Sequence, residues 1–328
     1  MLKYAVVGTG WIVQSFIDGT KYVPEFCLSA VYSRSYERGL ELAQRNGIKT
    51  VFTSLEELAA SDVDCVYIAS PNSLHYSQSK KMLEAGKHVI CEKPLTVIPD
   101  EAQELIALAQ AKGLIYVEAI MYMYCPVREL LHSAIEEIGK VRSAHFDFSQ
   151  FSSKYPAFMR GELPNIFNPK MATGSLMDLG VYCVYPTVEL FGEPQNIVAS
   201  STFLSSGADG ATSAVMTCGD VLVTLTCSKT GQDYAGSQIV GEKGTITIES
   251  ISKLTGVTVR FNDGASKTLC GDTPKDVLMG NEARGFYELI TNPKDSAERY
   301  NELNETALAV SRTMKRIRET AGIKFDKG

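Results

Sequence analysis

Three polar side chains have the chemical types that proton transfer at an oxygen requires: Lys93, Asp178 and Tyr182. Asp178 and Tyr182 are four residues apart, so on a helix they project from one face. A free tyrosine, with a pKa near ~10, is a poor base at neutral pH, and a nearby ammonium lowers that pKa by favouring the phenolate. We expect Tyr182 to transfer the proton, Lys93 to polarise it and the substrate oxygen, and Asp178 to orient the substrate or the lysine. The alternative is a core aromatic residue at 182 and a helix cap or solvated residue at 178.

A second group of residues has the pattern of a phosphate-binding turn, namely Gly8, Thr9, Gly10, Trp11 and Ile12. It lies where a short apolar run turns into a helical pattern. The amino end of a helix binds a dinucleotide pyrophosphate through free backbone N–H groups and the positive end of the helix dipole. Gly8 permits the tight turn and Gly10 lets the phosphate approach the backbone, while Val13 replaces the third glycine of this fingerprint.

The end of the second predicted strand bears on which nicotinamide dinucleotide fits. An NAD site usually places an acidic residue there, which accepts hydrogen bonds from the ribose 2′-hydroxyl. Here Ser33 and Arg34 follow the strand, with no carboxylate before Glu37. Ser33 can donate to a 2′-phosphate, Arg34 can clamp it, and Arg38 adds a second positive charge. We expect NADP(H) to be preferred, with NAD(H) as a permitted alternative; otherwise Arg34 is a solvated surface residue.

The first third of the chain contains the elements that must position these residues. Short apolar runs alternate there with helical patterns of about ten residues. Strands that are apolar throughout indicate a parallel sheet with both faces covered. We predict a doubly wound α/β domain, a Rossmann fold, over residues 1–122. The runs predicted as strands are 4–7, 28–32, 51–52, 65–69, 88–91 and 114–118.

Two polar segments follow the fourth and fifth of these strands: Ser70, Pro71 and Asn72, then Glu92, Lys93 and Pro94. Ligands of open parallel sheets bind beyond the carboxyl ends of the strands, so both segments are expected to flank a nicotinamide. Pro94 restricts Lys93 to an extended conformation, which limits where the lysine can point. His75 begins the helix after the first segment, and either contacts the cofactor or packs at the helix start.

These segments carry a resemblance to a known family. Together with the first turn and the glycine-rich stretch 172–182, the segments 69–75 and 85–94 resemble the glucose–fructose oxidoreductase / inositol dehydrogenase family. A tyrosine at the last position of the glycine-rich stretch, here Tyr182, most resembles the dihydrodiol and NADP-xylose dehydrogenase branch of that family. The resemblance extends along the whole chain. It implies an oxidoreductase that passes a hydride between NAD(P)(H) and the CH–OH or C=O carbon of a sugar or diol, a cis peptide bond before Pro94, and a dimer or larger assembly.

The substrate-side residues depart from that family. Many relatives carry an arginine or histidine in the aromatic segment after the sixth strand, where this chain has Tyr122 and Tyr124. These tyrosines either stack on a ring substrate or fill the domain junction. Many relatives also carry an arginine where Ile166 stands here, next to Asn165. We include Tyr122, Tyr124 and Asn165 among the expected substrate contacts.

The pattern changes from residue 123 onward. Alternating apolar and polar residues over 142–151 indicate a strand with one buried face. We predict an α+β domain over 123–328 for substrate binding and dimerisation, with a mostly antiparallel open sheet. Helix 174–190 should cover one face, and the other should pair with a second subunit in a homodimer or homotetramer. Late helices are expected at 275–291 and 301–321, the last packing back toward the first domain.

Composition excludes several other partners. The chain has 328 residues, 21% of them charged, and a net charge of −6 with no basic stripe, which argues against nucleic acid. No stretch approaches the roughly 20 apolar residues of a membrane span. The eight cysteines lack zinc-site spacing, and free thiols suit a reducing cytosol. We expect a cytoplasmic protein with a small-molecule substrate, no metal and no membrane contact.

Two other functions share parts of this pattern. A nucleotide-sensing regulator on the same fold would need the glycine turn but not Lys93, Asp178 and Tyr182. An NAD-dependent glycosidase would use transient oxidation with a tightly held cofactor, and the inferred 2′-phosphate site argues against it. The sequence therefore favours the NADP(H)-dependent oxidoreductase.

Overall fold

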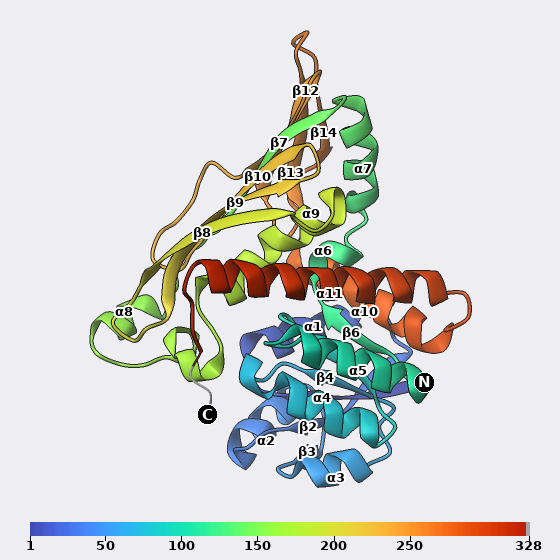
Figure 1. Cartoon of the computed structure of the whole chain (residues 1–328). Coiled ribbons are helices and arrows are strands. Elements are labelled where there is room, and N and C mark those ends of the chain that lie inside the picture. Colours follow the sequence, from blue (N-terminus) through green and yellow to red (C-terminus); the bar gives the residue numbers. More distant parts are fainter. Residues whose placement is uncertain (326–328) are drawn as a thin grey trace. The chain divides into compact units, whose positions relative to one another are not determined.

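The computed structural model describes residues 1–325, which form two compact units (Figure 1). The first unit comprises Met1–Tyr124 and Pro274–Leu308, and the second comprises Cys125–Thr273 and the chain from Ala309 onward. The sequence placed the boundary after residue 122 and assigned everything beyond it to the second domain. The segment 274–308 is counted instead with the first unit.

The first unit is built on a six-stranded parallel sheet in the order β3-β2-β1-β4-β5-β6. Strand order reverses between β1 and β4, which is the switch point where doubly wound sheets bind nucleotides. This confirms the predicted Rossmann fold. The strands are β1 (Leu2–Val7), β2 (Phe26–Tyr32), β3 (Thr50–Phe52), β4 (Cys65–Ile68), β5 (His88–Glu92) and β6 (Tyr116–Ala119).

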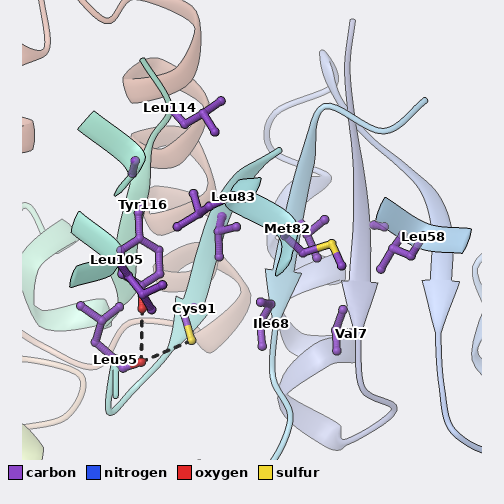
Figure 2. Packing of buried hydrophobic residues seen from close by; sticks show 14 of the residues in the cluster. Val7, Leu58, Ile68, Met82, Leu83, Cys91, Leu95, Leu105, Leu114 and Tyr116 are labelled. Atoms are coloured by element: carbon purple, nitrogen blue, oxygen red, sulfur yellow. Dashed lines mark hydrogen bonds between the residues drawn. The ribbon is translucent and has the colours of Figure 1, made fainter. Parts of the chain in front are cut away.

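Helices cover both faces of this sheet, as the predicted apolar strands require. Under the helices α3 to α5 lies a cluster of buried residues that includes Val7, Met82 and Leu105, shown in Figure 2. The opposite face is aromatic, and the rings of Phe16 and Tyr67 stack there with centroids 3.9 Å apart. The helices are α1 (Trp11–Thr20), α2 (Tyr36–Arg45), α3 (Leu55–Ala60), α4 (His75–Glu84) and α5 (Pro99–Ala111), with the short turns η1 (Asn72–Leu74) and α6 (Met121–Tyr124).

The two late helices are α10 (Lys275–Thr291) and α11 (Ala297–Thr320). α10 packs closely on α1, because a Cβ at Gly19 would meet the backbone of Met279 at 2.6 Å. Ala307 and Leu308 of α11 join the hydrophobic cluster of the first unit. The close contact between α1 and α10 explains why α10 is counted with the Rossmann unit.

The second unit contains an eight-stranded sheet in the order β14-β13-β12-β11-β7-β10-β9-β8. Every neighbouring pair is antiparallel except β7 with β10, which confirms the predicted mostly antiparallel sheet. The strands are β7 (Val141–Ser149), β8 (Asn196–Phe203), β9 (Asp209–Cys218), β10 (Val221–Ser228), β11 (Ser237–Gly241), β12 (Gly244–Ser250), β13 (Thr255–Phe261) and β14 (Ser266–Cys270).

One long helical segment of the second unit lies on this sheet. It consists of a π-helical turn, η4 (Leu176–Gly180), followed by α9 (Val181–Phe191), and both contact β7 and β10. The sequence predicted one helix over 174–190, without the π turn. The remaining helices are α7 (Val127–Glu137), α8 (Tyr155–Met159), η2 (Asn165–Phe167) and η3 (Pro169–Met171).

The opposite face of the sheet is partly apolar and exposed. Val198 of β8 pairs with Val215 of β9 and so shares its face, and Leu222 lies opposite Thr217 two residues further along. Their exposed fractions are 70%, 46% and 49%, in the order Val198, Val215, Leu222. A row of exposed apolar side chains of this kind is typical of a contact surface.

Residues 1–325 contain neither a membrane-spanning helix nor a group of side chains arranged for a metal ion. None of the helices described is both long and apolar enough to cross a membrane. No group of three or more His, Cys, Asp or Glu side chains within this range is arranged to hold a metal ion. All eight cysteines lie within this range as free thiols.

Candidate functional site

The turn between β1 and α1 has the geometry of a phosphate-binding loop. Gly8 has φ 119°, and a Cβ there would lie 2.7 Å from the carbonyl oxygen of Ala69, so glycine is required. Gly10 is the N-cap of α1, and a Cβ added there would meet nothing within 4 Å. The amino end of α1, opened by Trp11 and Ile12, therefore has room beside it for an anion. This open space fits the pyrophosphate that the sequence predicted.

A pocket of about 270 Å³ lies beside this turn. It is lined by Thr9 from the turn and by Arg38, Glu41, Leu42 and Arg45 from α2. Two guanidinium groups with a threonine hydroxyl suit a phosphate monoester. The sequence analysis named Thr9 and Arg38 but missed Arg45. The spacing of seven residues between the arginines, two turns of one helix face, was the available signal.

The residues that follow β2 place this helix. Ser33 is buried, and its hydroxyl accepts the N–H of Ser35 at 3.2 Å. Ser35 then caps α2, because its hydroxyl accepts the N–H of Arg38 at 3.4 Å. Arg34 lies between them with an exposed side chain. Both arginines are thus free of the hydrophobic core.

His75 links the loops that follow β4 and β5. Its Nε2 lies 2.9 Å from the carbonyl oxygen of Ser70, and its Nδ1 lies 2.9 Å from that of Pro94. The side chain is buried, and burial lowers the pKa of the imidazole. Of the two roles that the sequence left open, these contacts are those of a residue that positions the two loops. The Lys93–Pro94 peptide bond is cis, as the family resemblance implied.

Two buried carboxylates hold the backbone around Lys93. Glu92 accepts the N–H of Lys93 at 3.3 Å and the hydroxyl of Tyr67, and burial raises its pKa. Glu118 accepts the N–H of Leu95 at 2.8 Å. Glu118 and Tyr67 were missed, although an acidic residue inside the buried strand β6 was a signal, because a buried charge needs partners.

The carbonyl oxygen of Leu95 is held as well. It accepts hydrogen bonds from the hydroxyl of Tyr116 at 3.5 Å and from the thiol of Cys91 at 3.7 Å, as Figure 2 shows. These two hydrogen bonds and the contacts of Glu92, His75 and Glu118 hold the backbone at each of residues 93 to 95. None of these contacts uses the side chain of Lys93.

In the second unit, Asp209 fixes the start of the helix that carries Asp178 and Tyr182. Its fully buried Oδ2 accepts the hydroxyl of Ser175 at 2.6 Å and the N–H of Leu176 at 2.7 Å. Gly174 permits this approach, with φ 145° and a Cβ position that would overlap Asp209 Oδ1. Burial raises the pKa of Asp209, while these donors oppose that rise. The sequence analysis missed Asp209.

Asp178 lies within the π-helical turn, and Tyr182 lies in the first turn of α9. The carboxylate of Asp178 forms an ion pair with Lys229, which is buried. The sequence expected Asp178 to orient Lys93 or the substrate and did not consider Lys229. Tyr182 is partly exposed, and its ring meets the ring of Phe148 edge-on at 5.4 Å.

The expected substrate contacts have packing partners inside their own units. Tyr122 is fully buried, and the ring of Tyr124 packs on Phe286 with centroids 4.8 Å apart. These contacts are made within the first unit, and the substrate role of the two tyrosines stays a prediction. Asn165 opens the short turn η2 in the second unit, and its carbonyl oxygen accepts the hydroxyl of Thr173 at 2.8 Å.

Two family models match the chain. One, described as "Oxidoreductase family, NAD-binding Rossmann fold", covers residues 2–119. The other, described as "GFO/IDH/MocA C-terminal domain", covers residues 127–247. The matches follow one another along the chain and together span most of it.

Curated relatives are similar over most of their length. The scyllo-inositol 2-dehydrogenase (NADP(+)) of Bacillus subtilis (strain 168) is 38% identical over 326 residues, which is 99% of this chain and 98% of that protein. The trans-1,2-dihydrobenzene-1,2-diol dehydrogenase of Mus musculus is 31% identical over 258 residues, 76% of this chain and 75% of that protein.

Solved structures share the fold at lower identity. A 3-ketoreductase from Actinomadura kijaniata, in complex with NADP and TDP-benzene, has a TM-score of 0.84 at 21% identity, covering 97% of each chain. A levoglucosan dehydrogenase in complex with NADH and levoglucosan has a TM-score of 0.82 at 18% identity, covering 98% of this chain and 97% of that one.

Proposed function

The chain belongs to the GFO/IDH/MocA family of NAD(P)-dependent oxidoreductases, and we propose that it oxidises a cyclic vicinal diol or polyol with NADP⁺, or reduces the matching ketone with NADPH. The observation that carries the chemistry is the place of Lys93, directly after the carboxyl end of β5, where hydrogen bonds hold the backbone of residues 93 to 95. Two relatives above 30% identity are named for scyllo-inositol and for a trans-dihydrodiol. Both names denote adjacent secondary alcohols on a six-membered carbon ring, which supports this substrate class.

The residues of the first unit fit the dinucleotide. When bound, the dinucleotide supplies the carbon that accepts or gives the hydride. The N–H groups at the amino end of α1, beside the open space at Gly10, would hold its pyrophosphate. Arg34 and Arg38 would hold the 2′-phosphate, with Ser33 beside them. The loops 70–72 and 92–94, which His75 links, would hold the nicotinamide end.

The proton is handled by Lys93 and Tyr182. In the oxidation direction Tyr182 accepts the proton of the substrate hydroxyl, and in reduction it returns that proton to the carbonyl oxygen. The ammonium of Lys93 stabilises negative charge on that oxygen and on the phenolate. Asp178, which forms an ion pair with Lys229, accepts a hydrogen bond from a second hydroxyl of the substrate. An adjacent diol satisfies both acceptors, which supports a vicinal diol over a simple alcohol.

The substrate class is tested by following NADP⁺ reduction across a panel of inositols, trans-cyclohexanediols, aldoses and linear polyols. We expect turnover on the cyclic vicinal diols. Turnover confined to aldoses would contradict the substrate class but not the oxidoreductase. If no compound reacts while NADPH still binds, the hydride-transfer proposal itself fails.

Coenzyme preference gives a separate prediction. Arg34→Ala is expected to weaken NADPH binding about 10-fold, because an exposed charge-assisted contact to the 2′-phosphate is lost. NADH binding should change by less than about 3-fold. Calorimetric titration with both coenzymes measures the difference, with Arg160→Ala, an exposed arginine of the second unit, as the control. Equal binding of NADH and NADPH by the wild type, unchanged in Arg34→Ala, would disprove the preference.

We also propose that the exposed sheet face of the second unit pairs with a second copy of the chain. The apolar row of Val198, Val215 and Leu222 supports this proposal. Val215→Lys is expected to convert a dimer or tetramer into a smaller species, because a lysine at an apolar contact loses its hydration without gaining a partner. Light scattering on a sizing column measures the mass, with Ile98→Lys in the first unit as the control. A monomeric wild type, or a variant of unchanged mass, would refute the interface.

A further inference from the structure

Lys275 lies over the ring of Trp11 in the first unit. Its ammonium nitrogen is 3.7 Å from the ring centroid, which is a cation–π contact. Trp11 is the first residue of α1, directly after Gly10, and its side chain is 71% exposed. Lys275 is the first residue of α10. A lysine far along the sequence is thereby held at the glycine turn.

The position of Lys275 follows from how α10 is anchored on α1. A Cβ at Gly280 would lie 2.7 Å from the ring of Tyr22. The hydroxyl of Tyr22 donates to Asp276 at 2.8 Å, and Arg284 donates to the carbonyl oxygen of Tyr22 at 2.7 Å. These contacts fix the first turns of α10 against the end of α1. The start of α10 is therefore a defined position and not a loosely attached end.

Two buried carboxyl groups also act on Lys275. Burial raises the pKa of Glu92 and of Glu282, and the charge of Lys275 opposes both rises. Glu282 is almost fully buried, and its Oε1 has no hydrogen-bond partner. Glu92 directly precedes Lys93. Lys275 is thus close enough to Glu92 to act on it electrostatically.

The charge balance of the glycine turn leaves a role for this lysine. A dinucleotide pyrophosphate carries about two negative charges, whereas a helix amino end offers the equivalent of roughly +0.5. Residues 8–12 contain no basic side chain, and Arg34 and Arg38 are already assigned to the 2′-phosphate. Arg45, which lines the pocket beside Thr9, forms an ion pair with Glu41 at 3.1 Å. A further cation beside the turn would balance the pyrophosphate.

We propose that Lys275 is part of the dinucleotide site and donates a charge-assisted hydrogen bond to the pyrophosphate, with the ring of Trp11 holding its ammonium in place. The proposal rests on the proposed coenzyme function and adds a binding residue from outside the βα series. Trp11 has two roles here, a backbone N–H at the helix start and a ring that positions Lys275. Through Lys275, the segment 274–308 contributes to the coenzyme site.

The test compares two fragments of the coenzyme, ADP-ribose and 2′-AMP. ADP-ribose carries the pyrophosphate without the 2′-phosphate, and 2′-AMP carries the 2′-phosphate alone. Lys275→Ala is expected to weaken ADP-ribose binding by roughly 10- to 100-fold, the loss of one charge-assisted hydrogen bond, and to leave 2′-AMP binding within about 2-fold. Lys275→Arg, which keeps the charge, should recover most of the affinity. Calorimetric titration gives each dissociation constant.

Fluorescence gives a second readout that does not depend on turnover. Trp11 is the only tryptophan in the chain, so the emission reports this site alone. We expect the emission of the wild type to change on adding ADP-ribose, because the ammonium over the ring gains a phosphate partner. In Lys275→Ala that change should be lost even at a concentration of ADP-ribose that saturates the variant.

The control is Lys21→Ala, at the far end of α1, where the lysine pairs with Asp18 on the surface. It should bind both fragments as the wild type does. If Lys275→Ala binds ADP-ribose within 2-fold of the wild type, or loses 2′-AMP binding equally, the proposal is overturned. The coenzyme function would survive either result, because NADP⁺ turnover by the wild type and the Arg34→Ala titration test it independently.

Discussion

Lys93→Ala is expected to lower kcat by about 100- to 10,000-fold, the range that a positioned acid–base group contributes. In the proposed mechanism the ammonium stabilises negative charge on the substrate oxygen and on the phenolate of Tyr182, and alanine does neither. Since this stabilisation is largest in the transition state, kcat should fall far more than KM rises. Steady-state kinetics with NADP⁺ and the fastest substrate of the panel measure both constants.

The structure gives a reason why this variant should fold and still bind coenzyme. The backbone at 93–95 is held by Glu92, His75 and Glu118, and none of these contacts uses the lysine side chain. A matched control is Lys87→Ala, because Lys87 precedes the amino end of the same strand and donates to the carbonyl oxygen of Ser61. The control should keep wild-type turnover. A Lys93→Ala enzyme with more than about a tenth of wild-type kcat would be incompatible with the mechanism.

Local patterns were sufficient for most of the fold. The run 65–69 and the helix 275–291 were predictable because apolar strands and amphipathic helices leave short-range signals, and the observed bounds are Cys65–Ile68 and Lys275–Thr291. The return of α10 to the first unit was not predictable in this way. It depends on Gly19 and Gly280, which allow two helices distant in sequence to approach closely. A glycine inside a helical pattern shows a site of close contact but not its partner.

The residues of the candidate site also differ in whether a local pattern or a distant partner determines their place. Lys93 and Tyr182 were selected as candidates because each lies in a motif with a recognisable context. Asp209 was missed because its partners, Ser175 and Leu176, are 34 and 33 residues away in sequence. Lys229 was missed for the same reason, since its partner Asp178 is 51 residues away. The π-helical turn was also missed, because its residues carry an ordinary helical pattern. What the sequence does not show is which distant charges meet.

Gly174→Ala is expected to destabilise the folded protein by about 3 kcal/mol or more. At φ 145° a side chain is strained, and the added Cβ would overlap Asp209 Oδ1. Asp209 would have to move, and its Oδ2 would lose the N–H of Leu176 and the hydroxyl of Ser175. Because this carboxylate fixes the start of the helix with Asp178 and Tyr182, kcat should fall as well. Urea unfolding and steady-state kinetics measure the two effects.

The control separates backbone strain from the clash with Asp209. Gly192, at the other end of α9, also has a positive φ, 79°, but a Cβ there would meet nothing within 4 Å. Gly192→Ala should therefore cost only about 1 kcal/mol and leave kcat unchanged. If both variants unfold at the same urea concentration, the contact between Gly174 and Asp209 has no special role. If Gly174→Ala is less stable but keeps full kcat, Asp209 stabilises the unit without positioning Asp178 and Tyr182. Only the combined loss supports Asp209 as a residue that positions the proton-transfer pair.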